Sequence, residues 1–260
     1  MSFSLVKDSV VLENPAAVLF DKDGTLIDIH HYWTSMIQIR AKLIGKHWFL
    51  GNSKRSSVEL ALMNAMGVDL DTGRMKPEGP VGVKPREYIV HVAVEEVCRN
   101  DHIVNDESME LLFQEADRVT AEDLRPLLRL LPGADTLLKK LKHCRIPMAV
   151  VSTDITSRAR KAFEILGLDQ YFSEIIGGDK VELTKPAPDL VLHVIEKLGC
   201  SANDVVVIGD HPVDIKMGAA AGVGLNIGVL NGLSLASAFQ GLPCTIVPDL
   251  TSIDILCTHA

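Results

Sequence analysis

Short runs of apolar residues recur along the second half of the chain, and stretches of helical periodicity lie between them. The apolar runs stand at 146–153, 172–178, 204–210, 223–229 and 243–247. The helical stretches between them lie at 155–167, 187–199 and 212–222. Continuous apolar strands separated by helices are typical of a parallel sheet that is covered on both faces. The pattern therefore predicts an α/β fold.

One further strand of this kind is expected at 16–20, far from the others in the sequence. The long interval that follows it carries helical patterns instead, at 30–45, 56–67, 85–100 and 106–128. Between these helices, 71–85 is rich in glycine and proline and is not expected to be regular. We therefore predict an α/β core whose first strand is separated from the rest by an inserted α-helical subdomain.

Composition and charge narrow the range of functions. The formal net charge is −8 and no block of like charges runs along the chain, so nucleic acid is not an expected partner. The five cysteines are scattered without zinc-ligand spacing, and we expect them to be reduced, mostly buried thiols. The first residues lack the apolar core of a signal peptide, and no stretch is long enough to span a bilayer. These features favour a soluble, cytoplasmic protein that does not act at a membrane.

Two acidic residues follow directly after the strand expected at 16–20. In extended backbone, Asp21 and Asp23 would face one point while Lys22 faces away, and Gly24 would allow a sharp turn after them. Ligands of open parallel sheets collect beyond the carboxyl ends of the strands, where this pair would lie. Two adjacent carboxylates repel each other, so a bound cation or a shared proton is expected. A solvated turn or a helix cap would explain an isolated pair of this kind equally well.

Other polar residues also stand at the ends of expected strands. Asp210 ends one strand and Asp214 lies one helical turn further on, Ser152 ends another strand, and Lys185 precedes a helix. Each residue alone has an ordinary explanation as a helix cap, a turn residue or a surface charge. Together they provide carboxylates for a hard cation, a nucleophile, a hydroxyl and a lysine around one anion.

Four motifs in this order, "DKDGTL", "VST", "KPAPD" and "GDHPVD", resemble those of the haloacid dehalogenase superfamily of phosphohydrolases. The tail "GVLNGLSLASAFQGLPCTIVPDL" resembles the end of its phosphoglycolate phosphatase-like branch, in which a helical C1 cap lies between the first two motifs. The resemblance implies a Rossmann-like parallel sheet core formed by 1–28 and 129–260, with a C1-type cap at 29–128.

The resemblance also implies roles for the reactive residues. Asp21 would attack phosphorus to form an aspartyl-phosphate, and Asp23 would protonate the leaving oxygen and then activate water. Ser152 would donate a hydrogen bond to a phosphoryl oxygen, and Lys185 would offset negative charge.

The implied cofactor is Mg²⁺. Its ligands would be the Asp21 carboxylate, the Asp23 backbone carbonyl and Asp210, with Asp214 as a further ligand or as a residue that orients the others.

The implied function is a Mg²⁺-dependent phosphatase for a small soluble phosphomonoester, such as a phosphoglycolate-like compound, a sugar phosphate or a nucleotide. A phosphosugar mutase of the β-phosphoglucomutase type, or a non-catalytic binding module on the same fold, are the alternatives. The expected partner is a small phosphorylated metabolite, and the chain could be a monomer or a homodimer. In the cap, His30 and His31 could line a substrate cavity or belong to a helix core. Three cations there are possible anion contacts, although solvated surface charge explains each more simply: Arg40, Lys84 and Arg86.

Overall fold

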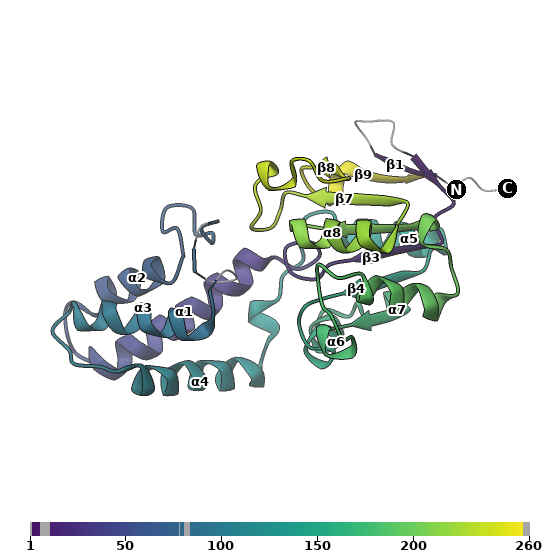
Figure 1. The fold of residues 1–260 in the computed structure, drawn as a ribbon. Helices are drawn as coiled ribbons and strands as arrows, with labels where there is room; N and C mark the ends of the chain where they lie inside the picture. The colour runs from purple at the N-terminus through teal and green to yellow at the C-terminus, as the bar shows by residue number, and fades with distance from the viewer. Residues whose placement is uncertain (1, 6–10, 78, 81–83, 257–260) are drawn as a thin grey trace. The chain divides into compact units, whose positions relative to one another are not determined.

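The computed structural model describes the chain except for residues 1, 6–10, 78, 81–83 and 257–260. The chain divides into two compact units (Figure 1). We call them the sheet unit, Met1–Ile29 with Leu128–Ala260, and the helical unit, His30–Leu127. None of the helices in the described part of the chain is long and apolar enough to cross a membrane.

The sheet unit is built on a six-stranded parallel sheet with the strand order β5-β4-β3-β6-β7-β8. Its strands are β3 (Ala17–Phe20), β4 (Met148–Val151), β5 (Glu174–Ile176), β6 (Val205–Gly209), β7 (Leu225–Val229) and β8 (Thr245–Val247). Its helices are α5 (Ala134–His143), α6 (Thr156–Leu166), α7 (Asp189–Leu198) and α8 (Pro212–Ala221). Short 3₁₀ turns are η2 (Asp169–Tyr171), η3 (Gly178–Lys180), η4 (Ala202–Asp204), η5 (Ala236–Phe239) and η6 (Leu250–Ser252). The α/β class and the parallel sheet predicted from the sequence are confirmed.

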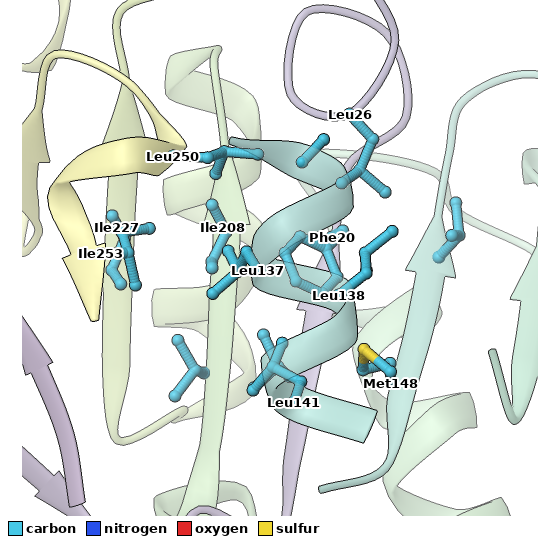
Figure 2. Packing of buried hydrophobic residues seen from close by; sticks show 14 of the residues in the cluster. Phe20, Leu26, Leu137, Leu138, Leu141, Met148, Ile208, Ile227, Leu250 and Ile253 are labelled. Carbon is cyan, nitrogen blue, oxygen red and sulfur yellow. The ribbon is translucent and has the colours of Figure 1, made fainter. Parts of the chain in front are cut away.

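The central strands are apolar throughout because both of their faces are covered. Alternate residues of β3 point to opposite faces, so Phe20 joins one buried cluster and Leu19 joins another. Helix α5 lies on the first face, where Leu137 and Leu138 pack with Phe20 (Figure 2). On the other face α7 and α8 supply the cover, with Leu190 among the residues that α7 contributes. Each such side chain contributes about 1.5–3 kcal/mol through burial.

A second, antiparallel sheet of three short strands was not predicted. Its order is β2-β1-β9, formed by β1 (Ser2–Leu5), β2 (Val11–Glu13) and β9 (Ile253–Leu256). The strands come from opposite ends of the chain, so their pairing leaves no local signal in the sequence.

The expectation of reduced, mostly buried thiols is wrong among the described cysteines, because one is oxidised and the free ones are half-buried or exposed. Cys144, just after α5, is disulfide-bonded, whereas Cys98, Cys200 and Cys244 are free. Cys257 lies outside the described residues.

The described residues of the helical unit form four α-helices and a 3₁₀ turn: α1 (Ile29–Trp48), α2 (Arg55–Ala65), α3 (Arg86–Cys98), α4 (Asp106–Glu122) and η1 (Arg125–Leu127). They follow the four helical patterns in the sequence, and their apolar stripes are buried, with Ile37, Leu62 and Phe113 fully enclosed. The Gly- and Pro-rich stretch 71–85 contains no helix or strand among its described residues.

Candidate active site

The carboxyl ends of β3 and β6 bring two predicted acidic residues together. These strands are neighbours with Phe20 opposite Ile208, so Asp21 and Asp210 emerge at the same edge of the sheet. The Asp21 backbone N–H continues the ladder by donating to the Ile208 carbonyl at 2.9 Å. Parallel pairing therefore fixes the positions of both residues before their side chains interact.

A third carboxylate, that of Asp214, joins them from the first turn of α8. One oxygen from each of Asp21, Asp210 and Asp214 lies within 4.8 Å of the other two. We call these three residues the carboxylate triad. All three are at least nine-tenths buried. Water therefore screens their mutual repulsion poorly.

Lys185 supplies a positive charge to the triad. Its Nζ donates to Asp21 Oδ1 at 2.5 Å and to Asp214 Oδ1 at 2.7 Å. Burial acts to lower the pKa of Lys185, but the charges and hydrogen bonds of Asp21 and Asp214 outweigh it and raise this pKa. The lysine is therefore a fixed cation that links β3 to α8.

One ammonium is too little charge for three carboxylates. Burial, followed by repulsion from Asp21 and Asp214, raises the pKa of Asp210 well above its ordinary value. Burial also raises the pKa of Asp21, although Lys185 opposes this effect. With all three carboxylates ionised, two negative charges would remain uncompensated. The available ligands are oxygens, which hard divalent cations such as Mg²⁺ prefer. The triad thus fits a Mg²⁺ site by charge and by donor type.

Helix α8 begins in a way that orients Asp214. His211 is the N-cap, its Nδ1 accepts the Val213 N–H at 3.3 Å, and its backbone N–H donates to Asp214 Oδ2 at 3.0 Å. Such a capping box satisfies N–H groups that a helix start otherwise leaves without partners. One oxygen of Asp214 therefore serves the helix start while the other faces Lys185.

The loop after β3 differs from the extended backbone that we expected. Extended structure ends at Phe20, and the Leu26 and Ile27 N–H groups both donate to the Lys22 carbonyl, closing a tight turn. The expectation that Lys22 faces away is wrong, because its Nζ lies 2.6 Å from Asp23 Oδ2 and 3.5 Å from Asp154 Oδ2. Side chains alternate only while the backbone stays extended.

Asp23 stands beside the triad without belonging to it. Its side chain is about one-third exposed and forms the ion pair with Lys22. Burial raises the pKa of this carboxyl, while Lys22 opposes the shift. A raised pKa favours the protonated form of the carboxyl, which is the form that a general acid needs.

Ser152 is the first residue after β4, the neighbour of β3 on its other side. The pairing of Phe20 with Val150 places Ser152 at the same edge of the sheet as Asp21. Its side chain is buried, and its Oγ accepts the Asp154 N–H at 3.1 Å. The hydroxyl hydrogen thus stays available for donation to an anion.

Sequence reasoning missed two residues around Asp210, Thr25 and Gly232, and it named Gly24 only for the sharp turn. Thr25 is fully buried, and its Oγ1 makes a long hydrogen bond of 3.4 Å to Asp210 Oδ1. Gly24, with φ +91°, and Gly232 leave space that the Asp210 carboxylate occupies. For Gly232, the available sequence signal was a glycine just after an expected strand, in "VLNGLS".

The histidines and cations named in the helical unit mostly serve its own structure. His30 is buried and its Nδ1 accepts the Met75 N–H at 3.1 Å, which favours a helix-core role for this residue. Arg40 is buried rather than solvated and donates to Asp117 at 3.1 Å, and Arg86 reaches the same carboxylate at 2.6 Å. These two arginines are thus committed to internal ion pairs.

A cavity of about 480 Å³ lies away from the triad. Leu225, Asn226 and Thr245 line it at the amino ends of β7 and β8, the edge of the sheet opposite the triad. The predicted reactive residues are absent from its lining.

Over most of its length the chain is similar to known hydrolases. Residues 15–222 match the model of the haloacid dehalogenase-like hydrolases. A phosphoglycolate phosphatase of Shigella dysenteriae is 33% identical over 227 residues, 83% of each chain. Its Shigella boydii counterpart is 33% identical over 132 residues, 50% of this chain and 52% of that protein, so that alignment spans about half of the relative.

A solved structure from Haemophilus somnus, described as a predicted phosphoglycolate phosphatase, has the same fold. Its TM-score is 0.60 at 22% identity, and the match covers 92% of this chain and 96% of that one. The family and the enzyme class predicted from the sequence are confirmed, because the matching family is one of hydrolases and the relatives are named as phosphatases. The chain therefore belongs to the haloacid dehalogenase-like hydrolase family.

Proposed function

We propose that the protein is a Mg²⁺-dependent phosphatase that hydrolyses a small phosphomonoester through an aspartyl-phosphate on Asp21. The observation that carries this proposal is the convergence of three buried carboxylates and Lys185 at one edge of the sheet. Three buried carboxylates around a single ammonium are more acidic groups than a structural ion pair needs, and one of them is the nucleophile of the proposed reaction.

In the first half of the reaction, an Asp21 oxygen attacks phosphorus and the bond from phosphorus to the ester oxygen breaks. Asp23 gives its proton to that oxygen, so the alcohol leaves neutral. Lys185 and the Ser152 hydroxyl stabilise the charge on the transferring phosphoryl group. The raised pKa of Asp23 favours the protonated form that this step requires.

In the second half, Asp23 accepts a proton from water as the water oxygen attacks phosphorus. The bond between phosphorus and Asp21 breaks, phosphate leaves, and both carboxyl groups return to their starting states. The net change is one ester and one water converted to one alcohol and one phosphate.

The metal would be held by Asp21, Asp210 and the Asp23 backbone carbonyl, with Asp214 as a further ligand or an orienting group. Bound Mg²⁺ supplies positive charge that lets an anionic nucleophile approach an anionic phosphoryl group.

The substrate would be a small phosphorylated metabolite. The names of the relatives favour phosphoglycolate or a compound of similar size. Sugar phosphates and nucleotides are the other candidate substrates. The proposal also includes three properties of the protein as a whole. It is cytoplasmic, it is divided into a core and a C1-type cap, and it is a monomer or a homodimer.

The test is release of inorganic phosphate from a panel of phosphorylated metabolites, measured with Mg²⁺ and with EDTA. We expect turnover of at least one compound with Mg²⁺ and none with EDTA. Asp21→Asn should abolish turnover without changing the circular dichroism spectrum, because an amide is a poor nucleophile. Asp169→Asn changes an exposed aspartate in η2, outside the four motifs, and is the matched control that should keep normal kinetics.

Phosphate release by Asp21→Asn at the wild-type rate would refute the covalent mechanism. A Thermotoga maritima protein that carries the name β-phosphoglucomutase shares the fold at 23% identity, with a TM-score of 0.63. Conversion of a hexose 1-phosphate to its 6-phosphate without phosphate release would therefore favour the mutase alternative.

A further inference from the structure

Asp210 is enclosed by the backbone of two loops that approach it from different strands. Gly24 belongs to the loop after β3, and Gly232 belongs to the turn that follows β7. A methyl group at either glycine would overlap the Asp210 carboxylate. The absence of side chains at these two positions therefore creates the space in which the carboxylate sits.

Gly232 is the more informative of the two glycines. Gly24 has φ +91°, so its identity is explained by backbone conformation alone. Gly232 is not among the positive-φ glycines, and its φ lies outside the range that disfavours side chains. Steric contact with Asp210 is therefore what an alanine would meet at position 232.

Rotation of the Asp210 side chain would not relieve this contact. A methyl group at Gly232 would overlap the carboxylate and would also lie only 2.7 Å from Asp210 Cβ. Because Cβ is fixed by the backbone, either the turn after β7 or the end of β6 would have to move. Movement of the end of β6 would shift the Asp210 carboxylate relative to Asp21 and Asp214, and movement of the turn would withdraw the backbone that packs against this carboxylate.

We propose that Gly232 is a positioning residue, which holds the Asp210 carboxylate in the orientation that completes the metal site. This inference rests on the proposed function, because it takes Asp210 as a ligand. The turn after β7 would act as a backbone wall behind the ligand, with Thr25 Oγ1 directing the other oxygen. Groups that orient a metal ligand affect metal affinity by about 10- to 100-fold.

The first experiment measures binding of Mn²⁺ alone, with free Mn²⁺ followed by electron paramagnetic resonance. Gly232→Ala should weaken binding by about 10- to 100-fold. Asn231→Ala changes the adjacent residue of the same turn without filling the space at Asp210, and it should bind Mn²⁺ as the wild type does. Equal affinity of Gly232→Ala and wild type would overturn the proposal.

The second experiment tests the contact between position 232 and the Asp210 side chain without metal. It can be carried out even if Gly232→Ala is unstable. Melting temperatures are compared for wild type, Gly232→Ala, Asp210→Gly and the double variant, all in EDTA. Removal of the whole Asp210 side chain should relieve most of the loss that Gly232→Ala causes. An equal loss in both backgrounds would mean that the alanine meets something else, and it would refute the proposed contact.

The two experiments separate failure of this inference from failure of the proposed function. A wild-type protein that binds no Mn²⁺ would contradict the metal site, while the melting comparison would still report on the contact. Normal Mn²⁺ binding by wild type together with normal binding by Gly232→Ala would contradict the positioning role alone.

Discussion

Lys185 is buried with its ammonium against two carboxylates, and this arrangement couples chemistry to stability. Its Nζ contacts Asp21 and Asp214, which lie on β3 and α8, so one side chain links two elements. A buried ion pair gains little over an apolar pair, but removal of one partner leaves a buried charge uncompensated. Replacement of Lys185 should therefore lower both the reaction rate and the free energy of unfolding.

We expect Lys185→Met, which keeps much of the side-chain volume, to lower kcat by at least about 100-fold, because a charge that stabilises the transition state is lost. Unfolding by urea should show a loss of about 3–5 kcal/mol, the usual cost of breaking a buried pair. Lys180→Met changes an exposed lysine near the same loop and should leave both quantities unchanged. Near-normal kinetics of Lys185→Met would remove this residue from the reaction.

The sequence allowed prediction of those site residues whose positions depend on strand order. Asp21 and Asp210 each follow an apolar strand, and parallel pairing brings such ends together. Two other features depended on the backbone of loops: the contact of Lys22 with Asp23, and the packing of Gly232 on Asp210. Neither has a periodic signature, because the first arises in a tight turn and the second in a contact between distant loops.

At the scale of elements, the start of a helix depends both on local sequence and on residues that are distant in the sequence. Helix α6 begins at Thr156, yet its N-cap, Ile155, makes no side-chain cap. The cap comes instead from Asp179, whose Oδ1 accepts the Thr156 N–H and hydroxyl, each at 2.7 Å. A carboxylate at this position also interacts favourably with the positive end of the helix dipole. Sequence periodicity predicted the helix, but a cap supplied from 23 positions away could not be predicted.

The hydrogen bonds from Thr156 lower the pKa of Asp179, which sets the pH dependence of its contribution. A carboxyl whose pKa is lowered by folding stabilises the fold above its ordinary pKa, and this contribution is lost as pH falls through the folded pKa. Wild type should therefore unfold at higher urea concentration than Asp179→Asn at pH 7, and the difference should shrink as pH falls below the ordinary aspartate pKa of about 3.9.

The control for that comparison is Glu182→Gln, which alters an exposed carboxylate further along the same loop. Its stability difference from wild type should stay small at both pH values. A gap between wild type and Asp179→Asn that persists at low pH would show that charge on Asp179 has no part in the cap.

At the scale of the whole molecule, the sequence pattern accounted for the parallel sheet and the succession of helices. The three-stranded sheet was missed because β1 and β9 come from opposite ends of the chain. The triad has the same long-range character, since Asp21 is far in the sequence from Asp210 and Asp214 and meets them only after the sheet unit has folded. Its repulsion is therefore a cost of the folded state alone, and a bound cation would offset that cost.

Metal binding should consequently reverse the order of stability of wild type and Asp210→Asn. In EDTA, Asp210→Asn should melt at a higher temperature than wild type, because it removes one of three crowded buried carboxylates. With Mg²⁺ at about 100 times its Kd, wild type should gain about 2.7 kcal/mol, or roughly 5–10 °C, while the variant gains little. The measurement is a thermal melt of both proteins under both conditions. A variant that is less stable than wild type in EDTA would mean that the triad is already compensated without a cation, and the metal site would lose its electrostatic basis.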